Sequence, residues 1–465
     1  MKRLSKNVIA ITGSDVARRL IGFLTIAYLT RHISVDQFGI INIGFTILTY
    51  ALLASSFGFN TYGARAIARG HSTNIVGTIL SVRILASVIV LMAILIGSFI
   101  FLADKSTMMI IMVMSIAVIP YAFMLDWFFQ GKERMEVIGA ARFIAAVVYF
   151  SVVIFFVRSP QDLVWVAIGS LISDSLSACI IWIIFRKDYG EYVPKFNLKN
   201  ARSIIKSSLP MGTGSMLAAI TMNLPTLVIG ILLSNYDVGI YSAAQKFVFF
   251  LLMIDRIIGT IFLPASSRIL AETPETLSAI LSQAKKWIIV FSLPICVGGT
   301  ILSSEIIITV FGAAYASSAN VFRILIWFFF ATVLHTIFSS GMLAVGQEKI
   351  YGKVMLLSAI IYFILIILGT IIFGVAGAAG GMVIAETATL LIMMIRLKKL
   401  LHVKSTDRLS KILLSVIVMG SVVFVLPVLP LFVAVLIGAG TYISMLFISK
   451  AITSAEIQTL ILRFV

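Results

Sequence analysis

Apolar runs of about 20 residues recur along the whole chain, separated by short polar segments. A helix of that length rises about 30 Å, which matches the hydrocarbon core of a membrane. We therefore predict about fourteen membrane-spanning helices. They fall at residues 7–30, 38–59, 79–103, 107–129, 138–157, 163–185, 206–232, 239–267, 286–304, 320–344, 352–372, 377–396, 410–428 and 430–449. The last two are divided only by Pro427-Val428-Leu429-Pro430, so a single re-entrant pair is the alternative.

The composition agrees with an all-α polytopic membrane protein. The 465 residues are 60% hydrophobic and 12% charged, with a mean hydropathy of +1.10, whereas soluble domains are about 25% charged. The first apolar run is interrupted at Asp15 and no small-residue cleavage site follows, so we expect it to remain as an anchor. Cys179 and Cys296 both fall inside spans, so no disulfide or metal framework is expected.

The net charge of +17 is explained by where the basic residues lie. With a cytoplasmic N-terminus, the inner segments hold 26 lysines and arginines, and the outer segments hold only Arg31, Lys105 and Arg158. This asymmetry places both termini in the cytoplasm. The basicity is thus a topology signal, and no nucleic-acid partner is expected.

The chain also resembles itself, at an offset of about 200 to 215 residues. Four short segments recur in the same order. They are Thr12-Gly13-Ser14 with Thr213-Gly214-Ser215; Asp36-Gln37-Phe38-Gly39-Ile40 with Tyr236-Asp237-Val238-Gly239-Ile240; Gln130-Gly131-Lys132-Glu133 with Gly346-Gln347-Glu348-Lys349; and the segments around Asp174 and Glu386. Repeats of this kind are typical of transporters.

Six spans separate the copies, so both should enter the membrane in the same orientation. We predict an N-terminal lobe at residues 1–185, a cytoplasmic linker at 186–206 and a C-terminal lobe at 207–397, with two extra spans and a cytoplasmic tail at 398–465. The two lobes would be related by a pseudo-twofold axis along the membrane normal, with a central cavity between them.

The first span contains three charges near its middle: Asp15, Arg18 and Arg19. The two arginines lie roughly 17 Å from either end of the span, too deep for their side chains to reach the headgroups. One carboxylate compensates one guanidinium, so the other seeks an anion. We expect this group to bind an anionic substrate; the alternative is an ion pair that only locks helix packing. The repeat copy has Met216, Ala219 and Ile220 at matching places, which favours specialisation of the first lobe.

The seventh span carries Pro210, Gly212, Gly214 and Pro225, so its backbone hydrogen bonding is interrupted twice. Broken helices in transporters mark bending points or ligand-binding carbonyls, and Asn223 between them would line the cavity. A static kink is the alternative.

The eighth span contains Lys246, Asp255 and Arg256. Neighbouring residues on a helix point about 100° apart, so Asp255 and Arg256 do not neutralise each other by geometry alone. We expect Arg256 and Lys246 to face the cavity, while a purely structural contact is the alternative for Arg256.

The duplicated acids Asp174 and Glu386 are candidates for proton or ion coupling, together with Asp255, because a buried carboxylate can carry a proton. The competing interpretation pairs each acid with a nearby lysine or arginine. We expect Arg83, Arg142 and Arg323, near the span ends, to extend toward the headgroups.

Several chemistries are not indicated. There is no phosphate-binding Gly-x-x-x-x-Gly-Lys-Ser/Thr loop, and nothing resembles a catalytic site. The histidines are scattered without metal or triad spacing, at His32, His71, His335 and His402.

Short motifs along nearly the whole chain resemble the O-antigen repeat-unit flippases, a polysaccharide transporter family of the multidrug/oligosaccharidyl-lipid/polysaccharide (MOP) exporter superfamily. They are Leu29-Thr30-Arg31-His32, Asp36-Gln37-Phe38-Gly39, Phe57-Gly58-Phe59, Gly63-Ala64-Arg65, Asp126-Trp127-Phe128-Phe129-Gln130-Gly131 and Asp237-Val238-Gly239-Ile240-Tyr241-Ser242-Ala243. Arg19-Leu20-Ile21-Gly22-Phe23 also resembles the first helix of the related lipid II flippases, where the arginine belongs to a cationic cavity. A second arginine usual in that group would fall near Thr25, and its absence argues against a lipid II substrate.

The resemblance implies a flippase of the bacterial inner membrane that serves lipopolysaccharide biosynthesis. It would move an undecaprenyl-diphosphate-linked oligosaccharide from the cytoplasmic to the periplasmic leaflet by alternating access. A polysaccharide polymerase and a chain-length regulator would be partners, with H⁺ or Na⁺ coupling and no other cofactor. The alternatives are a multidrug cation antiporter of the same superfamily, or a membrane polysaccharide polymerase or ligase, for which we would expect a large external loop.

Overall fold

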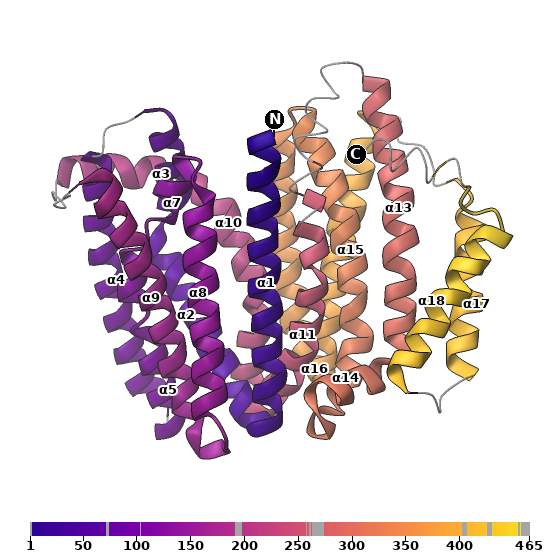
Figure 1. Cartoon of the computed structure of the whole chain (residues 1–465), viewed down its shortest axis with the longest axis horizontal. Coiled ribbons are helices and arrows are strands. Elements are labelled where there is room, and N and C mark those ends of the chain that lie inside the picture. Colours follow the sequence, from indigo (N-terminus) through magenta and orange to yellow (C-terminus); the bar gives the residue numbers. More distant parts are fainter. Residues whose placement is uncertain are drawn as a thin grey trace. The chain divides into compact units, whose positions relative to one another are not determined.

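The computed structural model describes residues 2–70, 74–102, 104–190, 198–256, 258–259, 262, 274–401, 407–425, 430–453 and 456; for residues 2–15, 74, 198–200, 211, 215 and 274–276 it describes the backbone alone. These residues form helices and connecting turns, without strands (Figure 1). The first half contains α1 (Lys2–His32), α2 (Val35–Ser56), α3 (Phe59–Ala68), α4 (Asn74–Phe101), α5 (Lys105–Ser115), α6 (Val118–Ala122), α7 (Asp126–Gly131), α8 (Met135–Phe156), η1 (Pro160–Asp162), α9 (Leu163–Tyr189) and α10 (Leu198–Leu232). The second half contains α11 (Asn235–Leu251), α13 (Pro274–Ile301), α14 (Ser303–Phe311), η2 (Ala313–Tyr315), α15 (Ser318–Ala344), α16 (Glu348–Lys398), α17 (Leu409–Val425) and α18 (Leu431–Ile448).

The prediction of an all-α polytopic membrane protein is confirmed. Among the described residues, 11 helical segments are long and apolar enough to cross a membrane, and α17 is a shorter apolar helix. The segment Glu348–Lys398 contains two of the predicted spans, because Gly374 has a non-helical backbone (φ 59°, ψ −140°) that reverses the chain inside α16.

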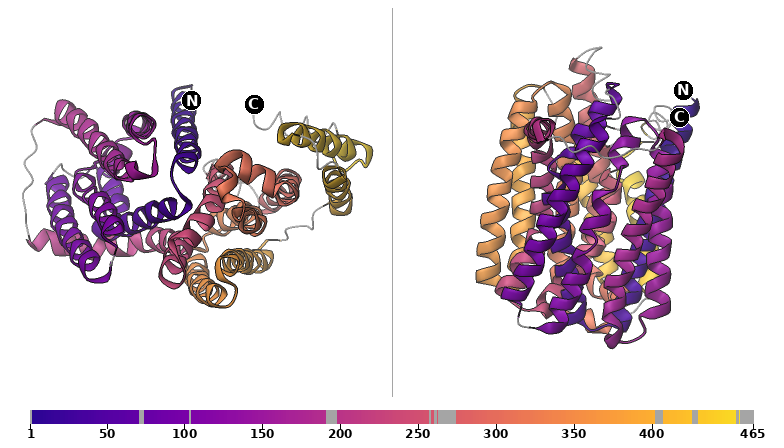
Figure 2. Two further views of the ribbon diagram at one scale, coloured as in Figure 1. Left: turned by 90° about the horizontal axis from the view of Figure 1, so that it is seen from below. Right: turned by 90° about the vertical axis from the view of Figure 1, so that its left-hand side faces the viewer.

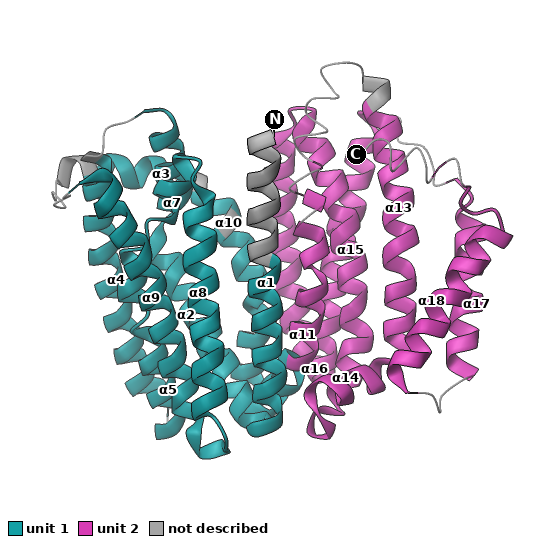
Figure 3. Cartoon of the chain, viewed as in Figure 1, with its two compact units in different colours: residues 1–242 teal, residues 243–465 magenta. Residues whose placement is uncertain are grey.

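The chain divides into two compact units, residues Met1–Ser242 and Ala243–Val465 (Figure 3). In unit 1, long helices run side by side along a common direction (Figure 2), and neighbouring pairs include α1 with α8, α8 with α9, and α2 with α4 and α5. The boundary between the two units falls inside α11. In the predicted linker at 186–206, helix α9 continues to Tyr189 and helix α10 begins at Leu198.

Close glycine contacts explain why α10 and the start of α11 group with the first unit. A Cβ at Gly39 of α2 would lie 1.9 Å from the carbonyl oxygen of Asn235, and one at Gly239 of α11 would lie 2.1 Å from that of Val35. At the other end of α2, a Cβ at Gly212 of α10 would lie 2.4 Å from the Cα of Gly58. Backbones approach this closely only where a glycine leaves room for the neighbouring chain.

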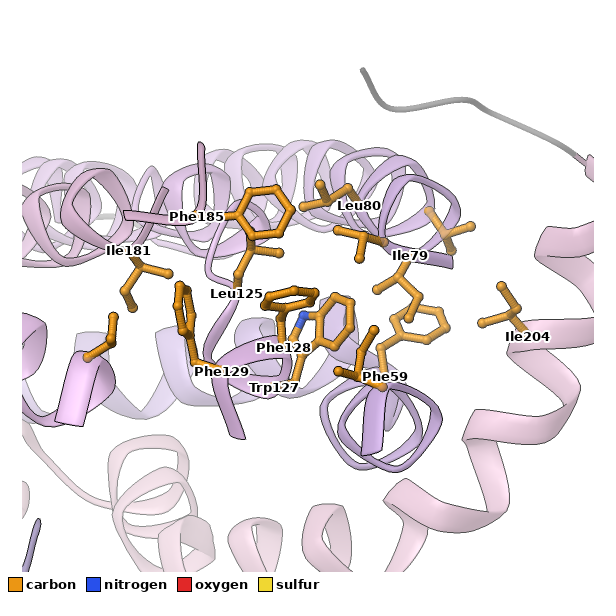
Figure 4. Close-up of a cluster of buried hydrophobic side chains, with 14 of the residues drawn as sticks. Phe59, Ile79, Leu80, Leu125, Trp127, Phe128, Phe129, Ile181, Phe185 and Ile204 are labelled. Carbon is orange, nitrogen blue, oxygen red and sulfur yellow. The ribbon is translucent and has the colours of Figure 1, made fainter. Parts of the chain in front are cut away.

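The predicted span 107–129 is present as one apolar segment long enough to cross a membrane, Lys105–Gly131, but it is built from three short helices, α5, α6 and α7. The helix ends near Ala117 and restarts, and Pro120 in α6 has no N–H to continue the hydrogen-bond ladder. The last piece, α7, presents Trp127, Phe128 and Phe129 to a buried cluster (Figure 4). The side chains that surround them come from α3, α4, α9 and α10, namely Phe59, Ile79, Leu80, Ile181, Phe185 and Ile204.

Arg83 of α4 stabilises this break, contrary to the expectation that it extends toward the headgroups. It is 1% exposed. Its guanidinium donates to the carbonyl oxygens of Met124 and Tyr121, each at 2.7 Å, and lies 5.1 Å from the Tyr121 ring centroid. The Tyr121 carbonyl oxygen also accepts from the Met124 N–H at 3.0 Å in the turn that ends α6, so Arg83 gives it a further donor and gives the Met124 carbonyl a buried side-chain donor.

The other two arginines of that group are more exposed. Arg142 of α8 is paired with Asp126 at the start of α7. Arg323 of α15 donates from Nε to the Ser303 hydroxyl at 2.6 Å.

In unit 2, the two halves of α16 fold back on each other and pack beside α15 (Figure 1). A Cβ at Gly377 would lie 1.8 Å from the carbonyl oxygen of Gly369, so the halves meet through bare backbone. α13 packs against α15 and α17, and the Tyr442 hydroxyl of α18 donates to the Val290 carbonyl at 2.8 Å.

The last described residue, Glu456, is tied to two other elements. Its carboxylate accepts a bond from Lys286 Nζ at 2.8 Å and lies 4.0 Å from Arg408. Although partial burial opposes ionisation, the hydrogen bond from Lys286 and these two positive charges keep the pKa of Glu456 below its ordinary value.

Candidate functional site

The C-terminal half of α1 is fixed to α8. The Tyr28 hydroxyl lies 3.2 Å from the carbonyl oxygen of Ile154 and 3.0 Å from that of Val157, where α8 ends. Its ring stacks on His32 with centroids 4.0 Å apart. Thr25 is buried and donates to the carbonyl oxygen of Ile21. The end of α1 is thus held in place, which sets the register of its polar middle.

Arg18 and Arg19 lie in that middle and are partly buried. Arg19 is 13 residues before His32 at the end of α1, so about 20 Å of helix separates it from that end. Both cations thus lie near the middle of α1, a helix whose end is anchored to α8. The side chain of Asp15, the predicted compensating acid, lies outside the described residues.

The predicted hinge residues lie in α10, which is continuous from Leu198 to Leu232 with Pro210 and Pro225 inside it. Each proline leaves one carbonyl of the preceding turn without its usual donor. Gly212 packs on Gly58, while a Cβ at Gly214 would meet nothing within 4 Å. Bending at these positions stays a prediction.

Asn223 lies beside Pro225 and turns its amide back onto its own helix, where Nδ2 donates to the Ala219 carbonyl at 2.9 Å. One turn away, the Tyr50 hydroxyl of α2 donates to the Ile220 carbonyl at 3.1 Å.

The remaining predicted cationic residues lie in unit 2. Lys246 is half-buried on α11. Arg256 lies ten residues further along the chain and is exposed. It interacts electrostatically with the neighbouring Asp255.

The two duplicated acids have different surroundings. Asp174 of α9 is partly buried near Tyr149 and Arg142 of α8. Glu386 is buried in α16, and its two carboxylate oxygens have separate partners: Oε1 lies 2.9 Å from Nδ1 of His335, and Oε2 accepts from the Tyr362 hydroxyl at 2.6 Å. The alternative was that Glu386 pairs with a lysine or arginine, but its two contacts described here are with a histidine and a tyrosine.

Asp255 joins this cluster, since it interacts electrostatically with both His335 and Glu386. The structure therefore brings together two of the three predicted coupling acids and adds two residues that sequence reasoning missed, His335 and Tyr362. Both residues are distant from Glu386 in the sequence, so their contact with it could not be predicted. The signal available for His335 was an ionisable side chain inside the apolar span 320–344. No group of three metal-ligating side chains is placed to hold a metal ion in the described part of the chain.

Comparisons with known proteins agree with these features. The sequence profile of the family described as "Polysaccharide biosynthesis protein" matches residues 4–270. A curated protein of Shigella dysenteriae named "Putative O-antigen transporter" is 24% identical over 366 residues, which are 78% of this chain and 91% of the relative. A protein of the same name from Escherichia coli (strain K12) is 23% identical over 423 residues, 86% of this chain and 98% of the relative.

Among solved structures, the lipid II flippase MurJ in an inward closed conformation superposes with a TM-score of 0.75 at 16% identity. The match covers 94% of this chain and 98% of that one. At this identity the likeness concerns the fold, which is shared over nearly the full length of both chains.

Proposed function

Because the chain belongs to the family of polysaccharide biosynthesis proteins, we propose that it is a flippase for an undecaprenyl-diphosphate-linked oligosaccharide, such as an O-antigen repeat unit. The head group would pass from the cytoplasmic to the periplasmic leaflet of the bacterial inner membrane. The predicted family resemblance is confirmed, and with it the MOP-type transporter fold.

The chain is a multi-pass membrane transporter and not an enzyme. Its curated relatives are named transporters, and its fold is that of a flippase. The polymerase or ligase alternative is therefore set aside.

The observation that carries the proposed substrate is the pair of arginines at the middle of α1. A guanidinium forms paired, charge-assisted hydrogen bonds with phosphate oxygens, and it stays charged at any physiological pH. A cationic group at mid-bilayer depth suits an anionic head group and disfavours the cationic substrates of a multidrug antiporter. Arg256, Lys246 and Asn223 would add contacts to diphosphate or sugar.

The proposed mechanism is alternating access. The lipid tail would stay in the membrane while the head group passes between the predicted lobes, with Pro210, Gly212, Gly214 and Pro225 as bending points of α10. An H⁺ or Na⁺ gradient would drive the cycle. The periplasmic product is the substrate expected by a polysaccharide polymerase and its chain-length regulator, which we propose as partners, and both termini would be cytoplasmic.

Complementation of a flippase-null strain tests this function. We expect wild type to restore surface polysaccharide, Arg19→Ala to reduce it at least tenfold at normal membrane abundance, and Arg19→Lys to restore part of it. Arg18→Ala is tested in parallel. Arg31→Ala is the matched control, because it removes the same charge from the exposed end of the same helix.

Two results would count against the proposal. If wild type restores no polysaccharide, the chain does not move this substrate. If Arg19→Ala exports normally, α1 does not carry the anion site; if the variant protein instead disappears from the membrane, Arg19 holds helices together.

A further inference from the structure

Unit 2 contains an ionisable cluster deep in predicted spans, made of His335 of α15, Tyr362 and Glu386 of α16, and Asp255. The side chains of His335 and Glu386 are 14% and 6% exposed. His335 Nδ1 and the Tyr362 hydroxyl occupy one carboxylate oxygen each. His335 and Tyr362 thus meet at one carboxylate, and Asp255 interacts with the same carboxylate electrostatically.

A buried carboxylate in this setting needs a proton nearby. An isolated charge in a low-dielectric interior costs several kcal/mol, so Glu386 either ionises beside a protonated His335 or takes the proton itself. In both states the Glu386 and His335 pair shares at least one exchangeable proton between its oxygen and nitrogen atoms.

The cluster is not fully satisfied as it stands. His335 Nε2 and Asp255 Oδ1 are buried and have no hydrogen-bond partner among the described residues. Protonated His335 would present an unpaired N–H at Nε2, and ionised Asp255 an unpaired oxygen. Each protonation state therefore leaves a different buried group without a partner, so a change in protonation favours a change in packing.

Other charged and titratable groups face this cluster. Arg256 interacts with Asp255, and Tyr351 of α16 interacts with Glu386. With both carboxylates ionised, His335 neutral and the exposed Arg256 cationic, the cluster has a net charge of −1, so it can take up one proton without accumulating positive charge.

A purely structural contact would not need ionisable groups. The halves of α16 are already joined nearby by a neutral bond between the hydroxyls of Ser358 and Thr389, both buried. The hydroxyl pair of Ser358 and Thr389 joins the two halves of α16. The carboxylate of Glu386 and the imidazole of His335 can in addition bind a proton.

We propose that His335, Glu386 and Asp255 form a proton-binding site in unit 2, with Tyr362 as a positioning residue, and that its occupancy is coupled to export. The coupling part rests on the proposed flippase function, whereas proton binding does not. In one step a proton from solution adds to the site, Glu386 becomes neutral or His335 cationic, and the proton leaves again when the packing changes.

The direct test is a proton count on purified full-length protein in detergent. Difference titration should show wild type binding about one more proton than Glu386→Gln, and than His335→Gln, between about pH 5 and 9. Ser358→Ala is the matched control, because it alters the neutral bond of the same hairpin and should titrate like wild type. Identical curves for all four proteins would overturn the proton site.

The coupling is tested in proteoliposomes with the lipid-linked oligosaccharide that accumulates in the flippase-null strain. We expect an imposed pH gradient to speed head-group movement by wild type at least fivefold, and to have no effect on Glu386→Gln at an unchanged thermal midpoint. Tyr362→Phe should keep a reduced response. A response to a Na⁺ gradient alone, or a wild-type response in Glu386→Gln, would overturn the coupling.

These readouts separate the two proposals. If the titration difference is present but wild type moves no lipid, the proton site stands and the flippase function fails. If wild type moves lipid but the titration curves coincide, the flippase function stands and the proton site fails.

Discussion

At the scale of single residues, charged side chains inside the predicted spans differ in the kind of partner that each one has. Arg83 is paired with backbone carbonyls and holds a helix break. Glu386 is paired with ionisable and hydroxyl groups. Arg18 and Arg19 lie at mid-span on α1, where an anionic ligand is the proposed partner. We therefore assign Arg83 a structural role and propose a coupling role for Glu386 and a binding role for Arg18 and Arg19, according to what lies opposite each charge.

Arg83 supplies a stability prediction. Arg83→Met removes both bonds, so the Met124 carbonyl oxygen loses its side-chain donor and the Tyr121 oxygen keeps only backbone donors, at about 1–3 kcal/mol for each bond lost. We expect the thermal midpoint of the purified protein in detergent to fall by roughly 2–6 °C, since 1 kcal/mol shifts the midpoint of a chain of this length by about 1 °C. Arg142→Met removes an exposed ion pair and should change it by less than about 2 °C. Equal shifts for both variants would show that the carbonyl contacts are not what stabilises this break.

The sequence predicted Glu386 and Asp255 as functional acids, because carboxylates in apolar spans are rare and costly. It did not predict His335 or Tyr362 as their neighbours. That pairing depends on how α15 packs on α16, and a tyrosine or histidine alone in an apolar span is a common core residue. The burial of Arg83 was also not predicted, since the helix break that it stabilises lies on another segment of the chain and is brought to Arg83 by folding.

At the scale of helices, glycine pairs determine how closely the long helices approach. The positions of most spans followed from the apolar pattern, because about 20 apolar residues is a strong length signal. The break inside α16 at Gly374 falls between the predicted spans 352–372 and 377–396. The breaks within 107–129 were not predicted, since they depend on local backbone geometry at Ala117 and Pro120. The recurring segments that contain Gly39 and Gly239 prove to be in contact with each other.

This contact gives a prediction for the two glycines. In Gly39→Ala the new methyl group would lie 1.9 Å from the Asn235 carbonyl oxygen, so the helices must separate. Overpacking of this kind costs about 1–3 kcal/mol, and we expect lower thermal stability and reduced export. Gly239→Ala should behave alike.

The control for the glycine prediction is Gly97→Ala in α4, where an added Cβ meets nothing within 4 Å. Its export and thermal midpoint should match wild type. Wild-type behaviour of both Gly39→Ala and Gly239→Ala would show that the crossing tolerates separation and does not constrain α2 and α11.

At the scale of the whole molecule, the uneven distribution of lysine and arginine is the feature that sequence alone interprets best. It depends on counts over many loops and not on any one contact, so local errors in span boundaries do not affect it. The fold class and the family also followed from sequence, since both are encoded by patterns repeated along the chain. The division into lobes at 185 and 207 depends on packing, and it remains a prediction.

The orientation gives a labelling prediction. In a background without Cys179 and Cys296, a single cysteine at Lys105→Cys should react with a membrane-impermeant maleimide in intact cells. Lys132→Cys, also exposed, should react only after the inner membrane is permeabilised. The reverse pattern would contradict cytoplasmic termini.

The central claim is that this chain moves an anionic lipid-linked oligosaccharide across the membrane through contacts with the arginines of α1. The most direct measurement uses purified protein in proteoliposomes that contain this lipid, with an added glycosidase reporting how fast the head group reaches the outer leaflet. Wild type should expose the inner pool at least tenfold faster than protein-free vesicles, and the Arg18→Ala, Arg19→Ala double variant should not. A wild-type rate equal to that of empty vesicles, or equal rates for wild type and the double variant, would contradict the account.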